Sequence, residues 1–166
     1  MADADALTLA YLHAHPQEAA QVLDTLPSAQ VAALWAELPA RATAPCAAAM
    51  QPGAAGRALL ALDDASAAAL LAALPPVAAA PLLRALPAAR RAAWLARLPT
   101  RQAFALQALL QYPPDAVGAL TDTQALSFGP QTTVAQAVAA LHEGGQAQDL
   151  VLVDGGAHGL LGAVPV

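Results

Sequence analysis

The sequence predicts a mostly α fold: a right-handed superhelix (solenoid) of short helices, followed by a small, incomplete α/β unit. Three observations predict it. An apolar pattern repeats every twelve residues from position 15 to position 110, prolines recur at one slot of that repeat, and the pattern changes after Tyr112. The chain has 166 residues, is 58% hydrophobic and 11% charged, and carries a net charge of −5. This composition indicates a packed globular chain and disfavours a nucleic-acid partner.

The twelve-residue repeat defines one helix per unit. Proline takes the first position of five units, at Pro27, Pro39, Pro75, Pro87 and Pro99. The twelfth position is apolar in eight units, at Leu26, Leu38, Met50, Leu62, Leu74, Leu86, Leu98 and Leu110. Positions five, eight, nine and twelve share one face of an α-helix. Each unit is therefore predicted to be a helix of about two turns, which proline opens.

Helices this short need their neighbours. A two-turn helix is marginal in water because its nucleation is costly, so its apolar face must be buried on other units. Tandem units of this kind wind into a superhelix in which each helix is expected to pack mainly on its neighbours. The lone cysteine, Cys46, is expected to be buried. Trp35, Trp94 and Phe104 are likewise expected on or beside the packed face.

Some units carry residues that modify a helix start. Pro45 and Pro81 fall inside their units, so the helices that contain them are predicted to begin late. Asp63, Asp64 and Ser66 stand where a helix N-cap is needed. The uncharged stretch 65–83 is interrupted by prolines and keeps the repeat phase, so it is not predicted to span a membrane.

Charge is unevenly distributed along the repeats. No acid lies between Asp64 and Asp115, whereas five of the seven arginines do: Arg84, Arg90, Arg91, Arg97 and Arg101. These side chains form either an ordinary solvated surface or a docking face for an acidic partner. Phosphate binding has weaker support, because no glycine-rich phosphate loop accompanies them. No constellation of residues indicates catalysis, so the sequence predicts a protein that is not an enzyme.

A different pattern follows the repeats. The Tyr112-Pro113-Pro114-Asp115 run breaks the helical phase and opens a junction at 112–125, which separates the superhelix at 1–111 from a second unit at 126–166. In that unit a short strand at 126–128 precedes a helix capped by Thr132 or Thr133. Strands at 149–153 and 160–164, joined by a glycine-rich turn, complete a β-α-β-β unit.

This combination resembles the cytosolic part of MgtE-type magnesium transporters. The residues that carry the resemblance are the leucine-proline repeats, the junction 112–120, the pair Thr133-Val134 and the hairpin at 151–154 and 160–164. The resemblance implies an MgtE N-terminal superhelical domain followed by the start of a first CBS domain. It also implies a cytosolic regulatory region of the Mg²⁺-sensing type, in the cytoplasm or at the cytoplasmic face of the inner membrane. The implied partners are the remaining CBS and pore domains and a second copy that dimerises through CBS.

Two departures from the family pattern shape the functional expectation. The family's acidic motif, Asp-Pro-Asp-Asp-Ala-Ala-Asp-Leu-Leu, aligns with 75–83 of this chain, where every acid is absent. Because Mg²⁺ prefers carboxylate oxygens, no tightly bound cofactor is expected, although the resemblance admits Mg²⁺. Asp115 and Asp122 either cap helices or contribute to a residual metal site. The chain ends partway through the resembled CBS motif, which fits a fragment or a naturally short paralogue.

The alternative function is a helical-solenoid interaction module without ion sensing. A related superhelix occurs in a flagellar motor-switch protein, but the CBS-like tail argues against that relationship.

Overall fold

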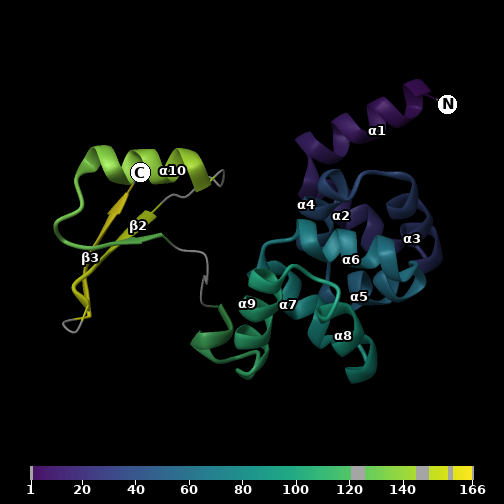
Figure 1. The fold of residues 1–166 in the computed structure, drawn as a ribbon. Coiled ribbons are helices and arrows are strands. Elements are labelled where there is room, and N and C mark those ends of the chain that lie inside the picture. The colour runs from purple at the N-terminus through teal and green to yellow at the C-terminus, as the bar shows by residue number, and fades with distance from the viewer. Residues whose placement is uncertain (1, 121–125, 145–149, 157–158, 166) are drawn as a thin grey trace. The chain divides into compact units, whose positions relative to one another are not determined.

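The computed structural model describes residues 2–120, 126–144, 150–156 and 159–165. It divides into two compact units, Met1–Thr121 and Asp122–Val166 (Figure 1). The mostly helical prediction is confirmed. The division falls inside the expected junction 112–125, and the domain bounds within that junction stay a prediction. Among the described helices, none is long and apolar enough to cross a membrane.

The first unit is a succession of short α-helices closed by a 3₁₀ turn. Its elements are α1 (Ala2–Ala14), α2 (Pro16–Thr25), α3 (Ser28–Glu37), α4 (Ala40–Ala49), α5 (Pro52–Ala61), α6 (Asp64–Ala73), α7 (Pro76–Arg84), α8 (Ala88–Leu95), α9 (Thr100–Leu110) and η1 (Val117–Leu120). From α2 to α9, one helix fills each twelve-residue unit, as predicted.

Proline explains why each helix begins and ends where it does. Pro27 has φ −58° and ψ 138°, the extended conformation of a residue just before a helix. Its carbonyl accepts the first helical hydrogen bond, from the Val31 N–H at 3.2 Å. The residue before a proline is disfavoured in the α region, and Leu26 accordingly adopts an extended conformation that ends α2. A Leu-Pro pair therefore stops one helix and starts the next.

The helices pack on the second helix along the chain. The main contacts join α2 to α4, α4 to α6, α3 to α5, α5 to α7 and α7 to α9. The sequence predicted packing between neighbouring units, and the structure shows that the main partner is the second helix along the chain and not the next one. The extended Leu-Pro connectors turn the chain sharply between consecutive helices. The apolar face of one helix therefore packs on the helix after the next one. The N-terminal α1, which also packs on α4, completes this unit.

Burial follows the phase of the repeat. The first six units bury a small or β-branched residue at position five, namely Ala19, Val31, Thr43, Ala55, Ala67 and Ala79. Position nine supplies the large core residues, among them Leu59, Leu71 and Leu83, all fully buried. Small residues beside large ones let neighbouring helices approach closely without leaving voids.

The buried residues include most of those singled out in the sequence. Cys46, Trp35 and Trp94 are buried, as predicted. Phe104 was expected on or beside the packed face, but its side chain is 74% exposed. In α9 the core contacts come from Leu106 and Leu109 instead. Phe104 lies two residues before Leu106 on the helix and therefore points away from the core.

The two internal prolines do not delay their helices, so that expectation was wrong. Pro45 lies inside α4 and Pro81 inside α7, and both helices begin at their normal slots. Each proline removes one hydrogen bond to the carbonyl four residues earlier. For Pro45 that carbonyl belongs to Arg41, an exposed residue, so water can satisfy it. Packing of the remaining turns retains the helix.

The second unit has the predicted β-α-β-β order. It contains β1 (Ser127–Phe128), α10 (Val134–Gly144), β2 (Leu150–Asp154) and β3 (Leu160–Pro165). The sheet order is β1-β2-β3, with β1 parallel to β2 and β3 antiparallel to it. Asp149, expected to start the second strand, lies outside the described residues. The positive φ angles of Gly156 and Gly159, 65° and 72°, explain why glycine occupies the turn.

Thr133, one of the two expected caps, starts α10. Its backbone N–H donates to Gln136 Oε1 at 2.9 Å, and the Gln136 N–H donates to Thr133 Oγ1 at 3.3 Å. This reciprocal pair is a capping box. The helix then covers the sheet over an apolar hollow lined by Phe128, Val134, Ala137, Val138, Leu141, Val153 and Val164, among others.

Candidate functional site

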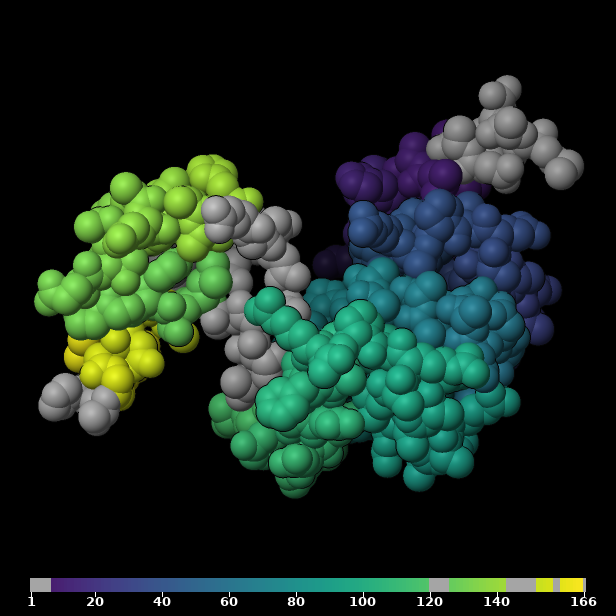
Figure 2. Space-filling view, viewed as in Figure 1, coloured from purple at the N-terminus to yellow at the C-terminus, as the bar shows by residue number. Residues whose placement is uncertain are grey.

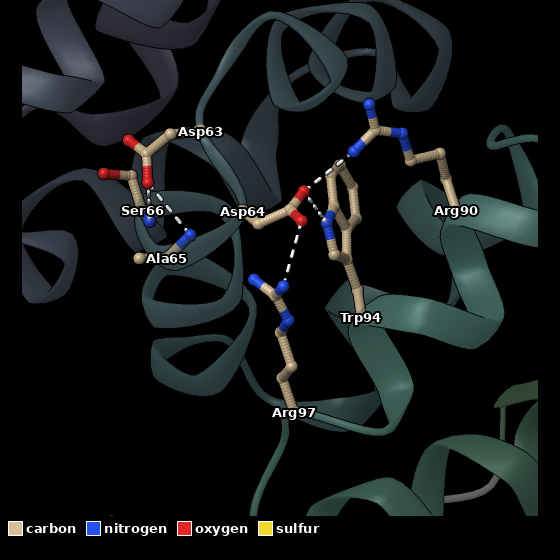
Figure 3. Close-up of polar contacts among 7 residues, drawn as sticks. All are labelled: Asp63, Asp64, Ala65, Ser66, Arg90, Trp94 and Arg97. Carbon is tan, nitrogen blue, oxygen red and sulfur yellow. Dashed lines mark hydrogen bonds and ion pairs between the residues drawn. The ribbon is translucent and has the colours of Figure 1, made fainter.

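Three side chains converge on the carboxylate of Asp64, at the start of α6 (Figure 3). Its Oδ1 accepts hydrogen bonds from Arg90 Nη1 at 2.8 Å and from Trp94 Nε1 at 3.0 Å. Its Oδ2 lies 3.1 Å from Arg97 Nη2. One carboxylate therefore joins α6 to α8 and to the connector that follows α8.

The repeat explains why these residues meet. Asp64 is the first residue of α6, where the helix dipole favours a negative charge. Arg90 and Trp94 are four residues apart on α8, so they share one face of that helix. Because α6 and α8 pack together, this face lies opposite the start of α6. The indole of Trp94 is fully buried and its N–H donates to Asp64, so Asp64 is both a charge partner of the arginines and a contact of the core.

The preceding acid, Asp63, has a separate structural role. It is the N-cap of α6, and its Oδ1 accepts from the Ala65 N–H at 2.9 Å and from the Ser66 N–H at 3.0 Å. This confirms the predicted cap at Asp63. Both carboxylates of the Asp63-Asp64 pair are engaged. Asp63 accepts hydrogen bonds from backbone N–H groups, and Asp64 forms ion pairs with two arginines.

Both carboxylates are stabilised in their charged form. The Trp94 N–H, followed by the charges of Arg97 and Arg90, lowers the pKa of Asp64 below its ordinary value. The hydrogen bonds from Ser66 lower the pKa of Asp63 in the same way. Bonds and cations that favour the ionised form always shift a carboxyl pKa downward.

These lowered pKa values predict acid sensitivity. In the unfolded chain both carboxyls titrate at about pH 4, so their stabilising contribution is complete above that value. It is lost progressively as the pH falls below about 4 toward the folded-state pKa values. We expect the urea midpoint to fall over this range, and to fall less in Asp64→Asn, which has no charge to lose there. An equal fall in both proteins would contradict the role of Asp64.

The remaining arginines separate into paired and unpaired groups. Arg84 Nη2 donates to the carbonyls of Leu109 at 2.6 Å and Tyr112 at 2.9 Å, so it binds the C-terminal end of α9. That position suits a cation because the helix dipole is negative there. Arg91 and Arg101 have no hydrogen-bond or ion-pair partner among the described residues. The arginines that the sequence grouped together therefore fall into two sets: those that bind other parts of the fold, and those without a partner among the described residues.

The junction contains one tight contact and one expected metal residue. A Cβ at Gly118 would lie 2.6 Å from Tyr112 Cδ1, so the Tyr112 ring lies directly on the glycine backbone and only glycine fits. Asp115, an expected metal candidate, is exposed and belongs to no group of three His, Cys, Asp or Glu side chains within the described part of the chain. Asp122, the other candidate, lies outside the described residues. The metal assignment stays a prediction for both.

The described residues contain no group of three His, Cys, Asp or Glu side chains that could hold a metal ion. The sequence did not predict two sets of contacts. One is the Asp64 cluster, whose other members lie 26 to 33 residues after Asp64. The other is the contact of Arg84 with α9. The available signal was an acid at a helix start and two cations two units later. That signal has meaning only once packing between alternate helices is known.

The architecture is that of a helical-repeat protein with a small α/β unit attached. Side-chain contacts between alternate repeats hold the helical part together. The family model described as the MgtE intracellular N domain matches residues 14–115, which is more than half of the chain. The chain therefore belongs to this family, and the resemblance noted in its sequence is confirmed.

Two solved structures share the fold. One, the soluble part of a magnesium transporter, is 22% identical, with a TM-score of 0.75 over 91% of this chain. The other, the cytosolic domain of the Mg²⁺ channel MgtE in complex with ATP, is 20% identical, with a TM-score of 0.70 over 88% of this chain. The alignments span 61% and 66% of those structures. No curated protein sequence matches the chain.

Proposed function

We propose that this chain is a cytosolic regulatory region of a magnesium transporter, in which the superhelix acts through protein contacts and not through a tight Mg²⁺ site. Membership of the MgtE N-domain family supports the first part of the proposal. The second part rests on one observation, which is that acids of the superhelix bind backbone and side-chain groups of the fold. Its partners would be the CBS and pore domains of the same transporter, and its location the cytoplasmic face of the membrane.

Three acids of the superhelix, Asp24, Asp63 and Asp64, are engaged in structural contacts. Asp63 caps α6, and Asp64 binds Arg90, Trp94 and Arg97. Asp24 accepts from the backbone N–H of Gln51, with both carboxylate oxygens at 3.1 Å. The helix α7, aligned with the family's acidic motif, carries no acid at all. A hard cation needs several free oxygens at one place, and these side chains do not offer them.

A second candidate is a protein-interaction solenoid with no link to ion transport. The observation that favours it is the pair of uncommitted arginines, Arg91 and Arg101, near the end of the superhelix. Unpaired cations on a surface of this kind favour an acidic partner. The two candidates share the absence of tight Mg²⁺ binding and differ in the partner, so co-purification with a transporter's pore domain would distinguish them.

Mg²⁺ should change the stability of this chain only slightly. An isolated carboxylate or two binds in about the millimolar range, so about 10 mM Mg²⁺ adds little to the free energy of unfolding. We expect a rise in Tm of no more than about two degrees in thermal unfolding at matched ionic strength. Screening is the main confounding effect, and NaCl of equal ionic strength is the control.

One result would contradict this proposal. A rise of about ten degrees in Mg²⁺, abolished by Asp115→Ala or Asp122→Ala, would place a sensing site at the junction. Asp64→Asn is the matched control, since it removes a carboxylate that the arginines already neutralise. If Asp64→Asn alone abolished the rise, the site would lie in the superhelix instead.

A further inference from the structure

The two ends of the superhelix leave core-phase residues uncovered. In the middle units, positions eight and twelve of the repeat are buried or nearly so. At the first unit, Val22 holds position eight and Leu26 position twelve, yet they are 58% and 39% exposed. Because the helices pack on alternate partners, a covering helix would stand two places before α2, where the described residues have none. In the last two units Trp94, Leu98 and Leu106 stay buried at these positions, and the residues left half-buried or exposed are at positions five and nine, among them Arg91 and Gln107.

The exposed surface at the start carries one acid among apolar groups. Glu18 lies four residues before Val22, so both lie on the same face of α2. The exposed Tyr11 contacts this carboxylate through its hydroxyl, which donates to Glu18 Oε2 at 3.3 Å. We call this set the entry face: Tyr11, Glu18, Val22 and Leu26. Its one acidic member is Glu18, whose Oε1 also lies 3.5 Å from His15 Nδ1.

The surface at the end carries the complementary set. A hollow between α8 and α9 is lined by Arg91, Leu95, Gln107, Leu110 and Gln111, which we call the exit face. Arg91 occupies position five of its unit and Gln107 position nine of the next, where the earlier units have small or apolar residues. Both departures from the repeat therefore line the same hollow. Arg91, between two leucines, has no partner among the described residues.

We propose that the entry face of one copy docks on the exit face of a second copy, so that the superhelices associate head to tail. The Glu18 carboxylate would then pair with the Arg91 guanidinium, while Val22 and Leu26 would cover Leu95 and Leu110. Figures 1 and 2 show α1 and α8 at opposite ends of the first unit. The stacked copies would continue the repeat, because each face exposes the residues that a further unit would bury.

The two faces differ, and this sets the form of the assembly. A contact between unlike surfaces leaves a free face at each end, so it extends into an open chain unless the rotation closes a ring. A self-complementary contact would stop at two copies. The proposal is independent of the transporter function, since it depends only on residues of the superhelix.

Sedimentation velocity of the full chain over a range of concentrations tests the proposal. We expect the mass to rise with concentration beyond two copies, and to fall with added salt. Arg91→Glu and Glu18→Arg should each weaken association roughly tenfold or more, because each places like charges opposite one another. The double variant Glu18→Arg/Arg91→Glu should restore it. An equimolar mixture of the two single variants should associate beyond two copies, because each variant pairs a glutamate with an arginine only when it alternates with the other.

The controls use Glu37→Arg and Arg41→Glu, exposed charges that belong to neither face. They should associate like the wild type, and circular dichroism checks that every variant keeps its helical content. Since Glu18 and Arg91 lie at opposite ends, a folding defect in one variant leaves the other informative. A wild type that stays monomeric or stops at two copies would overturn the proposal. Failure of the charge-swapped double variant to associate would also overturn it.

Discussion

Leu83→Ala should lower the free energy of unfolding by about 2–5 kcal/mol, as expected for a large-to-small change in a packed core. Leu83 is fully buried in α7, which packs on both α5 and α9. Removing its side chain leaves a cavity between alternate helices, and short helices have little propensity of their own to compensate. Urea titration followed by circular dichroism measures the change.

Leu7→Ala is the matched control for this prediction. Leu7 has the same side chain but is 73% exposed on α1, so its truncation should change stability by about 0.5 kcal/mol or less. Leu71→Ala, at the same repeat position one unit earlier, should behave like Leu83→Ala. A loss under about 0.5 kcal/mol at both core sites would mean that the phase of the repeat is wrong.

Much of the first unit could be predicted because two local rules act together. The Leu-Pro pair fixes the end of one helix and the start of the next, and the apolar spacing fixes which face is buried. Although the late starts expected for α4 and α7 do not occur, several helix bounds and the burial of Trp35, Leu59 and Leu83 follow from these rules. The same holds for the capping box at Thr133, whose partner is only three residues away.

The features that escaped prediction depend on how units meet. A periodic pattern tells which face of a helix is apolar but not which helix covers it, so packing between alternate helices was missed. The contacts of Asp64 and Arg84 depend on that arrangement, because their partners lie at least 25 residues away. Phe104 escaped for a related reason. As the superhelix ends, no further unit exists among the described residues to bury the second side of α9.

The predicted metal residues illustrate a limit of another kind. Aligning a family motif shows where acids are absent, at 75–83, but not what the remaining acids do. The sequence predicted an N-cap at the start of α6, which Asp63 provides, but only the structure shows that Asp64 binds arginines. Counting acids therefore overstates the capacity of this chain for a cation, because an engaged carboxylate has few free lone pairs.

Trp94→Ala should cost about 3–5 kcal/mol, the largest single effect expected in this protein. Trp94 is fully buried, and it is the only residue of α8 that is. Its loss removes the main apolar anchor of α8 together with the N–H that binds Asp64 at 3.0 Å. Guanidinium or urea unfolding, with helix content measured before the transition, gives the free energy and shows whether α8 remains folded.

Trp94→Phe separates the anchor from the hydrogen bond. Phenylalanine keeps most of the ring volume but has no N–H, so we expect a smaller loss, about 1–2 kcal/mol. If the indole N–H helps hold Asp64, then Asp64→Asn should have a smaller effect in the Trp94→Phe background than in the wild type. Strictly additive losses would mean that the two side chains do not cooperate. In that case Arg90 and Arg97 alone would hold the Asp64 carboxylate, and the join between α6 and α8 would be an ionic contact that added salt weakens.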